Sequence, residues 1–225
     1  MNKKIILVGG DPNSINSEII FKSWKKIPKN IKKKIILISN YNMLLDQFKR
    51  LNYKVNLMKI DNYYDFPNTS KLKVLNINLN YKNPFKVSKK SSSIFILKSL
   101  DLAHKLGLKK DVAGIINCPI NKNLLNKSKI GVTEYFATKC AVNDNSEVML
   151  IKNKKLMVSP LTTHLDIKSI PRKLTQKLII KKIKVIDIWY KKEFNKKAKI
   201  AILGLNPHNA ELRKNSEEKK IIIPA

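Results

Sequence analysis

The 225-residue sequence is poor in several kinds of residue, and each shortage excludes a class of protein. Its two cysteines, Cys118 and Cys140, are too few for the disulfide framework of a small secreted domain. No stretch approaches the roughly 18 consecutive apolar residues that a membrane-spanning helix needs. The apolar run near the start, residues 5–8, is also shorter than the core of a signal peptide. We therefore expect a soluble, cytoplasmic protein with no membrane partner.

Acidic residues and arginine are also scarce, which gives the positive charge an unusual composition. Sixteen Asp and Glu residues accompany 46 Lys and Arg residues, for a formal net charge of +30, but only three of the basic residues are arginine. Proteins that recognise nucleic acids favour arginine forks and interleaved aromatic side chains. The lysines here are scattered along nearly the whole chain, so we interpret them as compositional drift and expect no specific nucleic acid partner. The charge still favours weak attraction to polyanions and to a phosphorylated substrate.

The first half of the chain alternates short apolar runs with helical periodicity. Strand-length apolar runs are followed by stretches whose apolar residues recur at helical spacing. Strands are predicted at residues 3–10, 32–39, 54–60, 73–79 and 111–120, and helices at residues 13–27, 41–52 and 91–110. This order predicts an α/β fold with a mainly parallel sheet.

Beyond residue 120 the pattern is less regular. Short helices are predicted at residues 121–128 and 133–142, and a hairpin at residues 147–164. A long amphipathic helix is predicted at residues 169–194 and a strand at residues 197–206. We place a domain boundary between residues 115 and 116, which gives a first α/β domain, 1–115, and a second, 116–225.

Only three histidines occur, and two of them directly follow apolar runs. His164 ends the stretch "KLMVSPLTTH" and His208 ends "KIAILGLNPH". Ligands of parallel α/β sheets bind beyond the carboxyl ends of the strands, where two imidazoles can share a zinc or cobalt ion. Spacing alone leaves a second interpretation open, that each is an unrelated turn residue, because no short ligand motif joins them. The third, His104, is expected on a helix surface.

Five segments occur in the order and spacing of a known family: "GDPNSINSEI", "NCPINK", "GVTEYF", "LTTHLDIKSIP" and "LGLNPHNAE", the last followed by the closing "IIIPA". The chain therefore resembles the 4-hydroxythreonine-4-phosphate dehydrogenases of pyridoxal phosphate biosynthesis. The resemblance implies a two-domain α/β/α fold, related to the isocitrate and isopropylmalate dehydrogenases. It also implies a homodimer with active sites at the domain and subunit junction. The implied reaction is the oxidation of 4-phosphohydroxy-L-threonine, dependent on NAD (or NADP) and on a divalent metal (Zn, Co or Mg). The absence of a GxGxxG motif fits that family's non-Rossmann cofactor site.

The resemblance assigns roles to individual residues. His164 and His208 match two of the family's three metal-binding histidines, and Thr133 matches a substrate-contacting threonine. Lys122 matches the lysine of the family's P-x-x-K stretch, where it would contact a phosphate or carboxylate; the alternative is that it is one more surface lysine. It assigns no catalytic or cofactor-binding residue in this chain.

Departures from the family pattern leave other functions open. Val132 stands where the family usually has a substrate-contacting histidine, and the glycine-rich continuation after His208 is lost. The family continues for roughly a hundred residues beyond "IIIPA", so we expect its third metal histidine and much of its cofactor site to lie outside these residues. The alternatives are a degenerate homologue that binds a phosphorylated ligand without catalysis, a dehydrogenase of a phosphorylated four-carbon sugar acid, and a basic nucleic-acid-associated protein.

Overall fold

The computed structural model describes residues 3–125, 131–142, 147–163 and 165–225. The chain divides into two compact units, Met1–Lys139 and Cys140–Ala225. The sequence placed the boundary earlier, between residues 115 and 116. The structure differs because β5 (Val112–Asn117) pairs with the first strand of the chain, and the helix that follows it packs onto the same unit.

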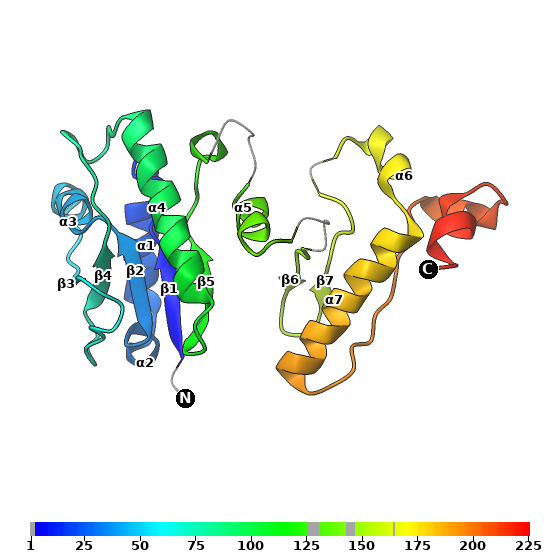
Figure 1. Cartoon of the computed structure of the whole chain (residues 1–225), viewed down its shortest axis with the longest axis horizontal. Coiled ribbons are helices and arrows are strands. Elements are labelled where there is room, and N and C mark those ends of the chain that lie inside the picture. The colour runs from blue at the N-terminus through cyan, green and yellow to red at the C-terminus, as the bar shows by residue number, and fades with distance from the viewer. Residues whose placement is uncertain (1–2, 126–130, 143–146, 164) are drawn as a thin grey trace. The chain divides into compact units, whose positions relative to one another are not determined.

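A five-stranded parallel sheet forms the centre of the first unit (Figure 1). Its strands run in the order β3-β4-β2-β1-β5. Their bounds are β1 Lys4–Val8, β2 Ile35–Ser39, β3 Leu57–Ile60, β4 Leu72–Asn76 and β5 Val112–Asn117. All five residues of β2, IILIS, are buried, which explains its continuous apolar run, because a central parallel strand is covered on both faces.

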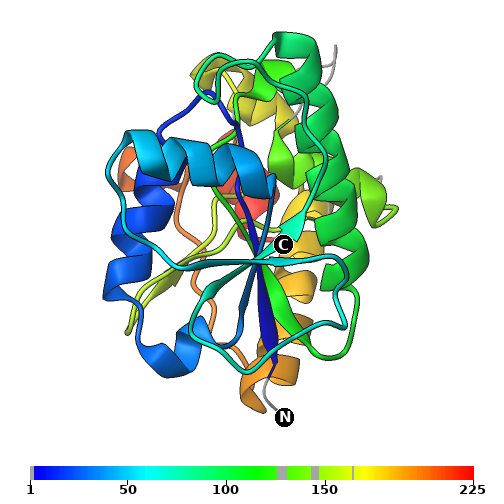
Figure 2. The ribbon, with the colours of Figure 1, turned by 90° about the vertical axis from the view of Figure 1, so that its left-hand side faces the viewer.

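Helices cover both faces of this sheet, which confirms the α/β fold (Figure 2). One face carries α1 (Asn16–Lys26) and α3 (Tyr41–Arg50), and the other carries α4 (Lys89–Gly107). The short helix α2, Lys29–Lys32, lies between α1 and β2 in the sequence. The alternation along β2 separates the two cores: Leu37 packs with the α1 and α3 side, whereas Ile36 and Ile38 pack with the α4 side.

Local sequence signals set the helix starts in this unit. The side chain of Asn40 accepts a hydrogen bond from Met43 N at 2.8 Å, and the Ser88 hydroxyl accepts one from Ser91 N at 3.2 Å. Both are N-cap residues, which satisfy backbone donors that have no partner inside the helix. Ser88 therefore sets the start of α4. The helix continues to Gly107 because one apolar face stays buried along its length.

The last part of the first unit contains η1 (Lys122–Leu124) and α5 (Val132–Lys139). Two bonds to Asp101 of α4 hold α5 in place. The Tyr135 hydroxyl donates to Asp101 Oδ1 at 2.8 Å, and Lys139 Nζ lies 2.7 Å from the same oxygen.

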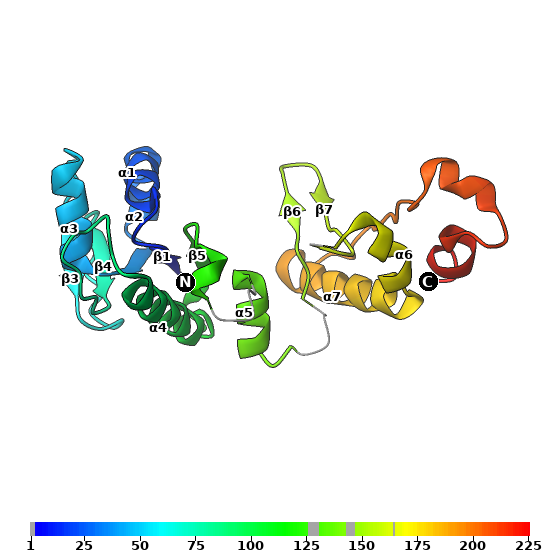
Figure 3. The same cartoon turned by 90° about the horizontal axis from the view of Figure 1, so that it is seen from above.

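The second unit is built around α7, Gln176–Phe194, shown from above in Figure 3. A small antiparallel hairpin, β6 (Ile151–Lys152) and β7 (Met157–Val158), precedes it, in agreement with the predicted hairpin. The short helices are η2 Ile167–Ser169, α6 Ile170–Lys173, η3 Pro207–Leu212 and η4 Glu218–Ile222. No helix within the described ranges is both long and apolar enough to cross a membrane.

The strand predicted at residues 197–206 is not formed in the structure. No strand of the described residues pairs with this segment, and a strand exists only where a neighbour completes its hydrogen-bond ladder. Its apolar side chains stay exposed, with Leu203 83% exposed. The apolar pattern of residues 197–206 is a property of the sequence, but a strand also needs a neighbouring strand to pair with, and the sequence does not specify one.

Candidate functional site

The carboxyl ends of β1 and β5 are joined by one amide side chain, that of Asn16. Its Nδ2 donates to Gly9 O at 3.0 Å, to Asp11 O at 3.3 Å and to Pro119 O at 2.8 Å. Gly10 has φ +75°, and a Cβ there would lie 2.5 Å from Asn16 Nδ2, so only glycine fits. Asn16 therefore fixes the loops after the two strands, at the edge of the sheet where α/β proteins bind ligands.

The "GDPN" segment after β1 is held by further loop contacts. Asp11 Oδ1 accepts from Asn13 N at 2.9 Å, and Asn13 Nδ2 donates to Val87 O at 2.8 Å. Buried Gln47 donates to Pro12 O at 2.9 Å. Asp11 thus acts within its own loop, as an Asx-turn residue.

Lys122 and Thr133 both belong to the first unit and both have exposed side chains. Lys122 begins η1, and Thr133 lies in the first turn of α5. Residues 126–130 between these two elements lie outside the described ranges. Val132, at the position where the resemblance gives a histidine, is partly buried against the core on the α4 side. Its role here is therefore packing, which leaves Thr133 as the exposed polar group of this turn.

The two histidines proposed as metal ligands lie in the second unit, and the structure describes one of them. His164 lies outside the described residues. His208 is exposed on η3, with φ +51°, directly after Pro207. An exposed imidazole is free to bind a metal ion, so the donor chemistry fits. Across the described ranges, no three His, Cys, Asp or Glu side chains gather into a metal-binding group.

A buried carboxylate holds the loop that carries His208. Glu218 is only 2% exposed, and its Oε1 accepts from Leu205 N at 2.9 Å and from Asn206 N at 2.8 Å. Asn206 Nδ2 also donates to both carboxylate oxygens, at 3.2 and 3.1 Å. The Asn206 N–H is the main cause that keeps the pKa of the Glu218 carboxyl below its usual value. No sequence pattern assigns Glu218 a role; its only signal is the Glu-Glu pair at 217–218, close after the His208 motif.

The backbone after His208 turns in the left-handed sense. His208, Asn209, Ala210, Glu211 and Leu212 have φ between 49° and 53°. The turn approaches the chain before it closely, because a Cβ on Gly204 would lie 2.0 Å from Asn209 Oδ1. Left-handed conformation costs about 1–2 kcal/mol per residue for L-amino acids other than glycine. The loss of glycines after His208, noted in the sequence, therefore falls on the positions where glycine would be favoured.

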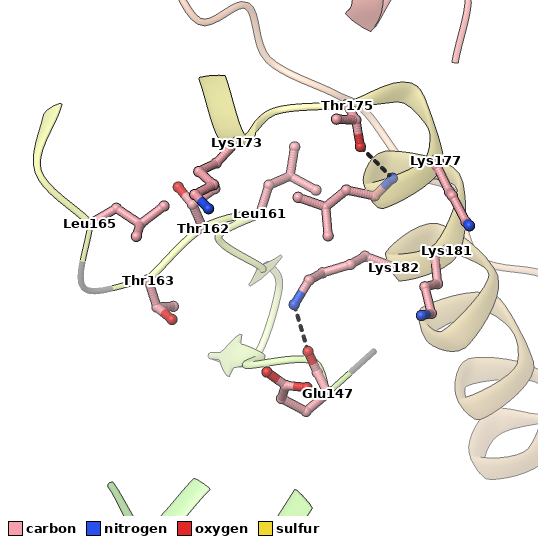
Figure 4. Close-up of a pocket in the computed structure, with 11 residues that line it drawn as sticks. Glu147, Leu161, Thr162, Thr163, Leu165, Lys173, Thr175, Lys177, Lys181 and Lys182 are labelled. Atoms are coloured by element: carbon pink, nitrogen blue, oxygen red, sulfur yellow. Dashed lines mark hydrogen bonds between the residues drawn. The ribbon is translucent and has the colours of Figure 1, made fainter. Parts of the chain in front are cut away.

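A cavity of about 540 Å³ lies between residues 161–163 and α7 (Figure 4). It is positively charged along one side. Its polar and basic lining includes Thr162, Thr163, Lys173, Lys177, Lys181 and Lys182. Lys182 reaches from α7 toward the opposite wall, where its Nζ donates to Glu147 O at 2.6 Å. A cavity of this size suits a small ligand, and its charge favours an anionic one.

His104, the third histidine, belongs to the first unit. It is half-buried on α4, and its ring stacks on that of Phe136 with centroids 6.4 Å apart. This agrees with the sequence interpretation of a histidine on a helix surface. Cys118 is also internal, and burial raises the pKa of its thiol to about 11, so it is not a nucleophile near neutral pH.

Comparisons with known proteins point to one family. The family model described as "Pyridoxal phosphate biosynthetic protein PdxA" matches residues 31–225. The 4-hydroxythreonine-4-phosphate dehydrogenase of Sulfurihydrogenibium sp. (strain YO3AOP1) is 32% identical over 231 residues, covering 99% of this chain and 69% of the relative. The protein of the same name from Aquifex aeolicus (strain VF5) is 32% identical over 232 residues, covering 100% of this chain and 70% of the relative.

A solved structure shows the same fold. The 4-hydroxythreonine-4-phosphate dehydrogenase of Klebsiella pneumoniae superposes with a TM-score of 0.85 at 25% identity. The match covers 99% of this chain and 70% of that one. The α/β fold with a parallel sheet expected from the sequence is therefore confirmed, and this chain spans about 70% of the length of these relatives.

Proposed function

Because this chain belongs to the PdxA family of pyridoxal phosphate biosynthetic proteins, an oxidoreductase family, we propose that it serves in the oxidation of 4-hydroxythreonine 4-phosphate. The proposed reaction uses NAD or NADP and a divalent metal ion, and takes place in the cytoplasm in a homodimer with its active site at the subunit interface. The relatives' shared name supports the substrate and the oxidation. The nicotinamide cofactor, the divalent metal and the homodimer are proposed from the sequence resemblance to the family.

His164 and His208 are the proposed metal ligands. A bound divalent ion would act as a Lewis acid on the substrate hydroxyl. A nicotinamide would accept the hydride from the carbon that carries this hydroxyl. The residues of this chain would orient the substrate: Thr133 offers a hydroxyl at the first turn of α5, and Lys122 offers an exposed amine. Both groups can donate to phosphate or carboxylate oxygens.

The observation that carries this proposal is the lysine-lined cavity bounded by Thr163 and Leu165, the residues on either side of His164. The two residues that flank a proposed metal ligand in the sequence thus line a basic cavity. That combination suits a substrate with a phosphate at one end and a metal-binding amino alcohol at the other. It favours a phosphorylated substrate over nucleic acid, because the cavity has the size of a small molecule.

The test is an absorbance assay of nicotinamide reduction with 4-phosphohydroxy-L-threonine, NAD and zinc. Two forms are compared: the 225 residues alone, and the same residues followed by the part of the Aquifex aeolicus relative that they do not match. The sequence expectation that further ligands lie outside these residues predicts turnover in the extended form. That turnover should require metal and be lost in His208→Ala.

Other outcomes of this assay separate the alternatives. Turnover of a phosphorylated four-carbon sugar acid in preference to the amino acid would replace the proposed substrate. Binding of the phosphorylated ligand without any turnover in either form would support a non-catalytic homologue. Turnover that is indifferent to chelators would overturn the metal requirement.

A further inference from the structure

Glu218 and His208 are ten positions apart, and a hydrogen-bonded bridge connects them. The Glu218 carboxylate accepts from the two consecutive backbone amides of Leu205 and Asn206, at 2.9 and 2.8 Å. Asn206 is followed by Pro207, whose ring fixes φ, and then by His208. Only Pro207, whose backbone is restricted, therefore separates His208 from the backbone amide of Asn206 that Glu218 holds.

The burial of Glu218 shows that this bridge is specific. A carboxylate that is 2% exposed is costly unless N–H groups replace its hydration shell. Here the replacement is complete enough to keep the carboxyl ionised: two backbone N–H groups and the amide of Asn206 all donate to it. Each of these donors lies in the loop that leads to His208, so the carboxylate has one visible structural consequence, the placement of that loop.

The helix that carries Glu218 is itself fixed to the rest of the second unit. Gln176 Nε2, at the start of α7, donates to Lys220 O at 3.0 Å. At the end of η4, the N–H of the next residue, Ile223, donates to Glu218 O at 2.9 Å. One hydrogen bond thus connects α7 to η4, and the bonds to the Glu218 carboxylate connect η4 to the loop at residues 205–206.

We propose that Glu218 is a positioning residue for His208: its carboxylate fixes the backbone of Leu205 and Asn206 and so presents the His208 imidazole to a divalent cation. The inference rests on the proposed metal role of His208. A glutamine at 218 would keep the shape and one acceptor oxygen for the Leu205 and Asn206 N–H groups, but it would remove the negative charge and set an NH2 group against Asn206 Nδ2 in place of Oε2. The hydrogen bonds that fix the loop would weaken, because bonds to a charged acceptor are stronger than bonds to a neutral one, and the His208 imidazole would be held less firmly.

The test is a titration of the purified chain with Co²⁺, read by the visible absorption of the bound ion. Glu218→Gln should weaken Co²⁺ binding about 10- to 100-fold, the range typical of groups that orient metal ligands. It should also change the visible spectrum at saturation, because the ligand geometry around the ion changes. Glu193→Gln, which removes an exposed carboxylate from α7, is the matched control and should leave both readouts unaltered.

A second variant guards against a trivial loss of folding. Glu218→Asp keeps the charge but shortens the side chain by one methylene, so it should fold, bind Co²⁺ more weakly than wild type and more tightly than Glu218→Gln. Circular dichroism spectra matching wild type would show that both variants are folded. A saturating spectrum and affinity equal to wild type in folded Glu218→Gln would overturn the positioning role.

The parent proposal fails in a different way. If His208→Ala binds Co²⁺ as wild type does, then His208 is no ligand, and the proposed function is wrong whatever Glu218 does. If His208→Ala loses binding while both Glu218 variants keep it, only the inference about Glu218 is wrong.

Discussion

Tyr135 donates a hydrogen bond of 2.8 Å to Asp101, and this bond joins α5 to α4. Burial acts to raise the pKa of the Asp101 carboxyl, but hydrogen bonds from Lys139 and Tyr135 outweigh it and hold that pKa below its usual value. Helix α5 carries Thr133, the proposed substrate contact, in its first turn. The placement of Thr133 thus depends on a contact between two helices of the first unit.

Tyr135→Phe should lower the free energy of unfolding by about 1.5 kcal/mol, because it removes one hydrogen bond to a charged group while keeping the buried ring. Denaturant unfolding of Tyr135→Phe, Asp101→Asn and the double variant measures the pairwise term. Strictly additive effects of the two changes would show that the bond contributes nothing.

Asn16→Ala should lower the free energy of unfolding by about 2–4 kcal/mol, which is more than Tyr135→Phe. The substitution leaves the carbonyl groups of Gly9 and Pro119 without their donor inside a buried site. Asn30→Ala, at an exposed position of α2, is the control and should change stability by less than about 0.5 kcal/mol. Equal effects of the two substitutions in denaturant unfolding would contradict the role of Asn16.

Lys73 should make stability depend on pH in the alkaline range. The residue is fully buried, its amine donates to Lys33 O at 3.0 Å and Thr69 O at 3.2 Å, and burial lowers its pKa to about 8. Between about pH 8 and its usual value near 10.5, the unfolded chain holds the proton and the folded chain does not. Stability should therefore rise with pH across this window.

The comparison that isolates this effect is with Lys73→Met, which cannot titrate. Wild type should gain roughly 1–3 kcal/mol relative to Lys73→Met between pH 8 and pH 10.5. Parallel pH profiles of the two proteins in denaturant unfolding would mean that the Lys73 amine keeps an ordinary pKa in the folded state.

The left-handed turn after His208 should accept glycine with a gain in stability. Glu211 is exposed with φ +51°, so Glu211→Gly relieves about 1–2 kcal/mol of backbone strain and loses about 0.5–1 kcal/mol to the greater freedom of the unfolded chain. Glu193→Gly, inside α7, should instead lose about 1 kcal/mol. Destabilisation of similar size by both changes would show that the turn is not left-handed in solution.

Much of the first unit could be predicted from the sequence, because its information is local. The apolar run of β2 and the helical periodicity of residues 91–110 are visible in short windows of the chain, and the structure has the corresponding strand β2 and helix α4. The second unit was harder to predict. Residues 197–206 have a strand pattern, but whether they form a strand depends on a partner that no local pattern specifies.

The site residues divide in the same way. Histidine at the end of an apolar run is a local signal, and it drew attention to His208. Asn16 and Glu218 act through groups far from them in sequence: Asn16 bonds the carbonyl of Pro119, and Glu218 bonds amides twelve and thirteen positions before it. Asparagine and glutamate are common on any surface, so only the folded chain shows that these two are buried and hydrogen-bonded to loop backbone.

The central claim, that His164 and His208 share one divalent ion, is tested most directly by calorimetric titration of the chain with zinc. Wild type should bind one ion per chain, and both His164→Ala and His208→Ala should abolish that binding, since a single imidazole cannot hold the ion. His104→Ala, which alters a histidine stacked on Phe136, should bind as wild type does. Retained one-to-one binding in either His164→Ala or His208→Ala would contradict the shared site.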